Sequence, residues 1–197
     1  MNRNRFLKNF MGLSLVSFWS CQVDEPAGKF VALEANVEGQ EEKEGVDLLR
    51  QELTAAWLRS ETMTLANVNQ MSPELFSFKY TDEAMTFAEQ WRHCVIYTCG
   101  QLTANTDLKN PYDEVKLPVQ MPKDAIIKEL KNMYTFVRQS IQALSREELL
   151  TNCNFAGDTI PVWRLFYALE NHIIHHRGQC VVYLRLSGVV PKGFYGW

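Results

Sequence analysis

The sequence lacks the cysteine and histidine patterns of the common metal and redox motifs. It has five cysteines, and no two of them form a Cys-x-x-Cys pair, so neither a thiolate zinc site nor a thioredoxin-like motif is expected. A His-Glu-x-x-His motif is also missing, because the residue after His172 is an isoleucine. The helix of the zinc proteases, with its built-in glutamate base, is therefore excluded.

An excess of positive charge is missing as well. The chain has 20 Lys and Arg against 23 Asp and Glu, which gives a formal net charge of −3, and the basic residues form no stripe along the sequence. Proteins that bind nucleic acid neutralise phosphates with clustered Lys and Arg. We therefore expect no nucleic acid among the partners of this protein.

Long apolar runs are absent too, and the one short run lies at the N-terminus. It covers residues 10–19, follows the basic residues Arg3, Arg5 and Lys8, and is followed by Cys21. The run is too short to span a membrane but has the pattern of an export signal. We expect residues 1–21 to be a signal peptide of the lipoprotein type, with Cys21 lipid-modified and the protein anchored at the cell envelope. The alternatives are an ordinary hydrophobic N-terminus and a cytoplasmic protein.

Residues 22–45 have the composition of a flexible linker. They contain Pro26, three glycines and a Glu-rich run, and too few apolar residues to order themselves. Their first four residues, QVDE, resemble the acidic surface-export signal of Bacteroidetes lipoproteins. We therefore expect the folded domain to begin at Val46.

Residues 46–197 contain four segments with the apolar spacing of amphipathic helices. We predict an all-α, four-helix bundle with helices over residues 46–68, 82–104, 123–144 and 161–187. Thr81 or Asp82 is the predicted cap of the second helix. Long loops separate the second helix from the third and the third from the fourth. In the latter connection, Ser145 and Glu148 have the spacing of a capping box that opens one short turn, and residues 151–159 are expected to be irregular. Gly188 is the predicted stop of the last helix.

Three of the four histidines lie in residues 170–179, ENHIIHHRGQ. No proline or glycine interrupts residues 162–177, and a helix would place His172 and His176 on one face, where they can hold a single ion. His175 points away from the apolar side. A buried histidine is more often a hydrogen-bonded structural residue than a ligand, so this pair alone leaves both interpretations open.

The same stretch, followed by VVYLRLSGVVPKGFYGW, resembles the C-terminal signature of the DinB/YfiT-like family. FAEQWRHC at residues 87–94 resembles the second-helix motif of that family, and LLRQELTAAW at residues 48–57 resembles its first helix. The resemblance covers residues 46–197. It implies a four-helix bundle that holds a divalent metal, zinc or nickel, through one histidine of the second helix and two of the fourth. In this sequence those residues are His93, His172 and His176.

The spacing of the second helix does not by itself favour His93 as a ligand. His93 lies opposite the apolar stripe of that helix, beside Gln90 and Tyr97. Either this helix buries a second and more polar face, or His93 is exposed. Spacing alone favours exposure, whereas the resemblance implies a ligand.

Other residues near the histidines allow two interpretations each. Arg177 and Gln179 are candidates for hydrogen-bond donors to the site, or they are solvated. Glu89 lies one turn before His93 and could reach the ion, but a surface charge is the simpler interpretation, so no general base is evident. Gly178 interrupts the histidine helix, which indicates a close approach of another backbone there.

Three neutral histidines leave an open coordination position for water or substrate. The resemblance implies a metal-dependent hydrolase or a thiol S-transferase that acts on a small-molecule substrate. Export would make thiol transfer less expected, because small cellular thiols are cytoplasmic. A non-catalytic envelope protein that binds a metal or a small ligand is the alternative, as is a purely structural bundle. The protein could also form a homodimer.

The four cysteines that follow the predicted signal peptide are favoured as buried free thiols. An envelope location would permit disulfides among them, and the sequence cannot choose between the three full pairings of Cys94, Cys99, Cys153 and Cys180.

Overall fold

The structure is a computed structural model that describes residues 28–193, with side chains from Lys43 onward. The chain divides into two units, Met1–Glu41 and Glu42–Trp197. The predicted signal peptide and Cys21 lie outside the described residues. None of the helices in the described part combines the length and the apolar character that crossing a membrane requires.

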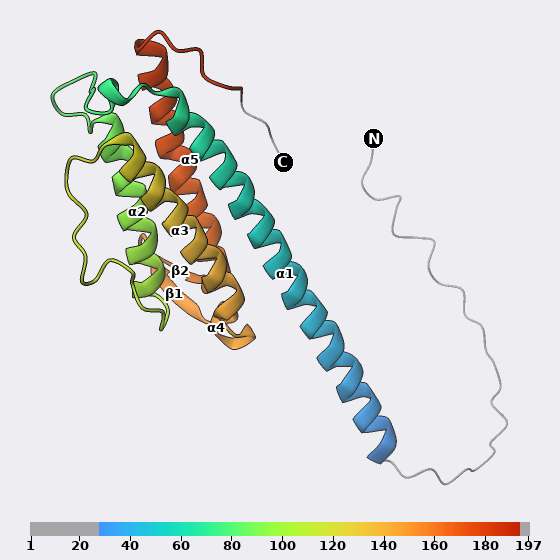
Figure 1. Ribbon diagram of the computed structural model, residues 1–197. Coiled ribbons are helices and arrows are strands. Elements are labelled where there is room, and N and C mark those ends of the chain that lie inside the picture. Colours follow the sequence, from blue (N-terminus) through green and yellow to red (C-terminus); the bar gives the residue numbers. More distant parts are fainter. Residues whose placement is uncertain (1–27, 194–197) are drawn as a thin grey trace, which may run out of the picture. The chain divides into compact units, whose positions relative to one another are not determined.

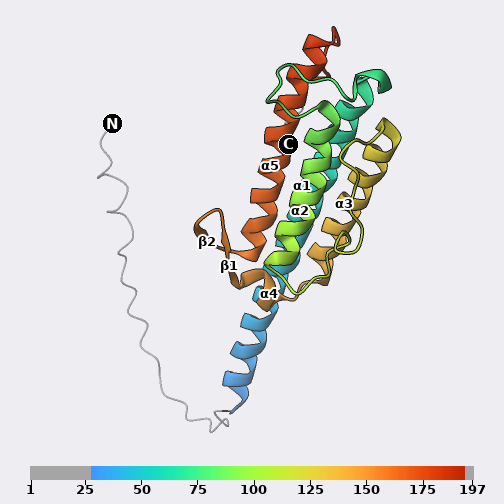
Figure 2. The ribbon, with the colours of Figure 1, turned by 90° about the vertical axis from the view of Figure 1, so that its left-hand side faces the viewer.

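Four long helices make up most of the described residues of the second unit and enclose one hydrophobic core (Figures 1 and 2). They are α1 (Gly28–Gln70), of which the part from Glu42 onward belongs to this unit, α2 (Phe87–Ala104), α3 (Lys123–Ala143) and α5 (Val162–Leu186). Helix α2 packs against both α3 and α5. The largest fully buried side chains come from all four helices and include Trp57, Trp91, Tyr134, Tyr183 and Phe166. The predicted all-α, four-helix bundle is confirmed.

Helix α1 begins earlier than expected. It starts at Gly28, so the prediction of a flexible linker is wrong for residues 28–45, which are helical. This stretch has three glycines but is otherwise rich in Glu and also contains Ala and Lys, all of which favour helix. Low hydrophobicity and glycine content were therefore a poor guide to its backbone.

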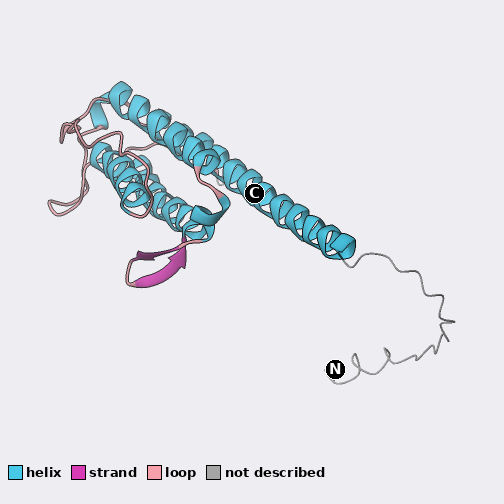
Figure 3. Cartoon of the chain, turned by 90° about the horizontal axis from the view of Figure 1, so that it is seen from below, coloured by secondary structure: helices cyan, strands magenta, loops and turns pink. Residues whose placement is uncertain are grey.

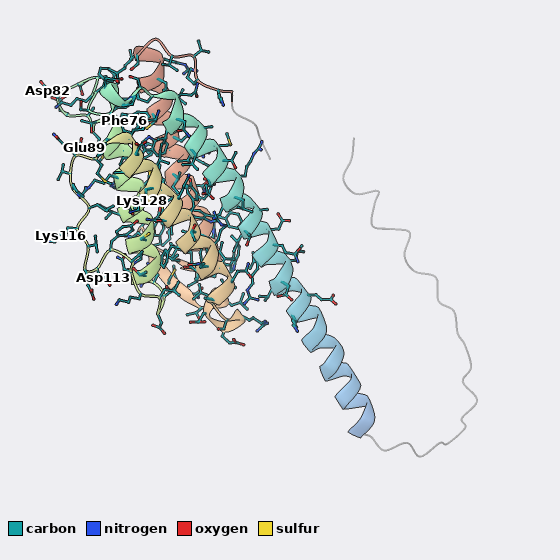
Figure 4. The ribbon with its side chains drawn as sticks, in the orientation of Figure 1. Phe76, Asp82, Glu89, Asp113, Lys116 and Lys128 are labelled. Atoms are coloured by element: carbon teal, nitrogen blue, oxygen red, sulfur yellow. The ribbon has the colours of Figure 1, made fainter. Side chains whose placement is uncertain are left out.

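Helix α2 begins later than expected. Thr81 and Asp82 were the predicted caps, but residues 81–84 form a turn and Thr86 caps the helix. The Thr86 hydroxyl accepts a hydrogen bond from the Glu89 amide, and the Glu89 carboxylate accepts one from the Thr86 amide. This reciprocal capping box satisfies two amides that have no partner within the helix. Figure 4 shows Glu89 at this end of α2 and Asp82 in the loop before it.

A long loop joins α2 to α3, as predicted, and Asp113 and Lys116 lie along it (Figure 4). After α3, Ser145 and Glu148 form the predicted capping box at the start of α4 (Arg146–Leu150). The short 3-10 turn η2 (Pro73–Leu75) follows α1.

Residues 151–159 are not irregular as expected. They form most of a hairpin of β1 (Asn152–Phe155) and β2 (Asp158–Pro161), which lies near α4 at one end of the bundle (Figures 1 and 3). Ala156 and Gly157 connect the strands, and both have positive φ, at 53° and 91°. Two such residues match the right-handed twist of a two-stranded ribbon. Alanine is not a usual residue for this turn, so the sequence did not indicate the hairpin.

The last helix, α5, ends where the sequence predicts. Gly188 has a φ of 75°, and Val189 donates its amide to the Leu184 carbonyl 2.9 Å away, which closes the helix C-terminus. The four cysteines in the described part of the chain are free, and three of them are buried, as favoured from the sequence.

Candidate metal centre

The three predicted ligands meet between two helices that pack directly against each other. His93 lies near the middle of α2, and His172 and His176 lie on successive turns of α5. His93 and His172 are half-buried and His176 is buried. Helix α2 therefore buries a second, more polar face that carries His93, and the exposure favoured by spacing alone is wrong.

The imidazole rings point their Nε2 atoms toward a common point. The Nε2 of His172 lies 3.2 Å from that of His93 and 3.1 Å from that of His176. A tetrahedral ion with ligand distances of about 2.0–2.1 Å separates its ligand nitrogens by about 3.3 Å. The cluster therefore has the spacing that one ion requires, and among the described residues it is made of these three histidines.

Hydrogen bonds alone do not satisfy this arrangement when the rings are neutral. A neutral imidazole has one N–H and one lone pair. The Nδ1 of His176 donates to the Gln90 Oε1, and this bond assigns the lone pair to the Nε2 of His176. The Nε2 of His172 faces two ring nitrogens but can form a good hydrogen bond with only one of them. A cation among three lone pairs removes this conflict.

Two further residues of α2 fix the rings in place. Gln90 is buried and bonds His176 from one side. The Tyr97 ring stacks on His172, with ring centroids 4.2 Å apart and planes 30° from parallel. The Nδ1 of His172 is buried and has no hydrogen-bond partner among the residues that the structure describes. Gln90 and Tyr97 were not predicted as part of the site, although their positions three before and four after His93 place all three on one side of the helix.

Burial keeps the cluster uncharged. Loss of water around the rings lowers the pKa of His172 and of His176 to about 4, and repulsion from the neighbouring histidines adds to this effect. Burial also lowers the pKa of His93. The three side chains are therefore neutral at physiological pH, and neutral imidazole is the form that binds a metal.

The neighbours of the ligands on α5 have other roles. His175 is exposed, as predicted. Arg177 is buried, but its guanidinium donates to the Ser60 carbonyl and the Thr64 hydroxyl of α1, each 3.4 Å away. Among the described residues, no hydrogen bond joins Arg177 or Gln179 to a histidine of the cluster. The residue that bonds a histidine of the cluster is instead Gln90, which accepts a hydrogen bond from His176.

One other expectation near the site, for Gly178, is corrected, and the role of Glu89 is defined. A Cβ atom added to Gly178 would meet nothing within 4 Å, so no backbone approaches closely there. The Glu89 carboxylate is engaged in the capping box at the start of α2. Within the described residues, the metal-binding cluster contains no carboxylate that could act as a general base.

Comparison with known proteins agrees with the family resemblance found in the sequence. The profile of the DinB family matches residues 40–197. The uncharacterized protein YrdA of Bacillus subtilis (strain 168) is 26% identical over 152 residues, which cover 72% of this chain and 84% of YrdA.

Two crystal structures share the fold. The DinB-like protein YjoA from Bacillus subtilis superposes with a TM-score of 0.58 at 17% identity, and the match covers 73% of this chain and 97% of YjoA. A DinB-like protein from Bacillus cereus ATCC 10987 superposes with a TM-score of 0.60 at 21% identity, with 74% and 97% of the two chains covered.

Proposed function

Because the chain belongs to the DinB family, we propose that it binds one divalent metal ion, zinc or nickel, through His93, His172 and His176. We further propose that the bound ion serves a hydrolase or transferase reaction on a small molecule. The observation that carries the proposal is the convergence of three Nε2 atoms, with contacts of 3.1 and 3.2 Å that hydrogen bonds alone do not satisfy.

A divalent ion held by three histidines would keep one coordination position open. The charge of the ion would lower the pKa of a water or thiol bound at that position. The protein's own residues prepare the ligands. Gln90 holds the proton of His176 on Nδ1, so its Nε2 presents a lone pair. Tyr97 covers one face of His172 and fixes its plane. Burial keeps the rings neutral, so metal binding does not have to displace protons at neutral pH.

Metal analysis of protein purified without a histidine tag tests the binding step. We expect about one equivalent of zinc or nickel per chain, and a melting temperature that rises on metal addition, because the ion binds the folded state. Turnover of ester, amide and thiol-conjugate substrates by the metal-loaded protein then tests the catalytic step. A protein that contains no metal and does not respond to added zinc or nickel would leave a structural bundle as its function.

A non-catalytic metal- or ligand-binding protein is the second candidate. It is favoured by the lack of a carboxylate in the histidine cluster of the described residues, since a general base usually accompanies such a reaction. Stoichiometric metal without turnover of any of these substrate classes would support it.

We also propose that the protein is attached to the cell envelope through a lipid on Cys21. The basic residues, the short apolar run and the cysteine that follows it support this proposal. Labelling with a palmitate analogue should mark the wild-type protein and not the Cys21→Ser variant. If the protein is unlabelled and cytoplasmic, the cell's small thiols become available to it, and thiol transfer becomes the favoured reaction.

A further inference from the structure

A cavity of about 620 Å³ lies between α1, α5 and the segment that follows α5. Four cationic side chains from these three segments line it, namely Arg59, Arg177, Arg185 and Lys192. Among the described residues that line it, none is Asp or Glu. The histidine cluster lies elsewhere: His176 bonds Gln90 on α2, whereas Arg177, the next residue, reaches Ser60 and Thr64 on α1.

The charge of this cavity is opposite to that of the whole protein. The chain has a formal net charge of −3, yet four cationic side chains line one space; one of them, Arg177, also interacts with the buried Glu170 carboxylate. Like charges held around a cavity repel one another, and their combined potential raises the local concentration of anions. An anion in the cavity would turn this repulsion into attraction.

A buried amide provides an independent indication of a ligand. Asn67 lines the cavity and is 6% exposed, and its Oδ1 has no hydrogen-bond partner. Buried polar atoms in proteins nearly always have partners, so one without a partner calls for an explanation. The side-chain amide offers both an acceptor and two donors. Because the atom without a partner is an acceptor, a ligand group satisfies it only by donating a hydrogen bond, as the P–OH of a singly protonated phosphate does.

Part of the remaining wall is apolar, and the rim is fixed by hydrogen bonds. Met63, Val181 and Pro191 are among the lining residues. Gln70 holds the segment after α5 against α1: its Nε2 donates to the Val190 carbonyl at 2.9 Å, and its Oε1 accepts from the Lys192 amide at 3.0 Å. The cavity thus combines a cationic lining with apolar surface.

We propose that this cavity binds a small organic phosphate monoester, with the phosphate head on an apolar body. Its volume lies in the range of about 300–1,000 Å³ that is typical of small-molecule sites. Arg177, Arg185, Lys192 and Asn67 bind the head, and the apolar walls contact the body. This site is separate from the proposed metal centre and does not depend on it.

Calorimetric titration of the full chain with n-hexyl phosphate tests the proposal, with inorganic phosphate and hexanol as probes of the head and the body alone. Hexyl phosphate should bind saturably, and more tightly than either partial probe. The double variant Arg185→Gln/Lys192→Gln changes two exposed side chains and should weaken binding by about tenfold or more. Arg164→Gln, an exposed site at the other end of α5, should bind within about twofold of wild type.

Two further variants separate this site from the metal centre. Asn67→Leu should weaken hexyl phosphate binding while the protein still melts cooperatively. His176→Ala should bind hexyl phosphate as wild type does. The proposal is overturned if the full chain does not bind hexyl phosphate, if the Arg185/Lys192 double variant binds normally, or if His176→Ala abolishes binding.

Discussion

His176 and Arg177 are adjacent on α5 and both buried, yet they serve different environments. His176 faces α2, where Gln90 and two more histidines surround it and burial keeps its ring neutral. Arg177 faces α1 and lines a cavity surrounded by positive charge. One step along a helix turns a side chain by about 100°. A single helix of a four-helix bundle therefore presents different chemistry to each of its neighbours.

The largest expected effect is on the histidine side. His176→Ala and His93→Ala should each weaken zinc binding by more than about 100-fold. Losing a ligand costs more zinc affinity than losing a residue that hydrogen-bonds a ligand. His175→Ala is the matched control and should bind zinc as wild type does. Competition with a chromophoric chelator measures all three. Normal zinc binding by His93→Ala would refute the three-histidine site.

A smaller loss should follow when the partner of a ligand is removed. Gln90→Leu leaves the proton of His176 free to move between its two nitrogens and should weaken zinc binding by about 10–100-fold. Gln101→Leu, a half-buried glutamine farther along α2, provides the control. Equal zinc affinity in the two variants would mean that Gln90 serves packing only.

The opposite pattern is expected on the other side of α5. Arg177→Met removes the hydrogen bonds to Ser60 and Thr64 and should lower the free energy of unfolding by about 1–3 kcal/mol. Zinc affinity should stay within about twofold of wild type, because Arg177 does not bond to the histidines. Urea unfolding and the same chelator competition measure the two quantities. A large loss of zinc affinity would show that the two sides of α5 are coupled.

The two sides should also differ in their response to pH. The unfolded chain binds protons on His172 and His176 near pH 6.5, whereas the folded chain binds them near pH 4. Between these values the unfolded state holds more protons, so the stability of the metal-free protein should fall as the pH falls from about 6.5 to about 4. Urea unfolding at stepped pH measures this slope. His172→Leu should make the slope shallower, and Arg177→Met should change it only through the Glu170 carboxyl, whose pKa the Arg177 charge lowers.

The smallest effect concerns the exposed side of α5. Gly178→Ala should raise the free energy of unfolding by at most about 1 kcal/mol, because the position is helical and a Cβ atom there meets nothing. Gly188→Ala has equal space but a φ of 75°, so it should lower stability instead. If Gly178→Ala destabilises the protein, the backbone around Gly178 is constrained in a way that its open surroundings do not indicate.

The helix boundaries that sequence predicted best are those that local chemistry fixes. The ends of α3 and α5 and the start of α4 depend on residues such as Ser145, Glu148 and Gly188, whose hydrogen bonds and backbone angles involve only near neighbours. The start of α2 was missed because Thr81, Asp82 and Thr86 all have the character of a cap. The hairpin was missed because Ala156 adopts a conformation that alanine seldom adopts.

The site was predicted unevenly. Helical spacing alone paired His172 with His176, but only the family resemblance pointed to His93, since the apolar stripe of α2 faces away from it. Gln90 and Tyr97 lie beside His93 in the helix and would have been found by treating that face as buried. The cationic cavity could not be found in this way, because Arg59, Arg177 and Lys192 lie on three segments that only the fold brings together.

Local sequence was enough to specify the four helices and the face that His172 shares with His176. These follow from spacing and capping, which act over a few residues. The tertiary structure decided that His93 meets the other two, that Gln90 rather than Arg177 supports them, and that four positive charges surround one cavity. Each of these depends on which faces of α1, α2 and α5 pack together, and that choice is made by burial across the whole core rather than by any one segment.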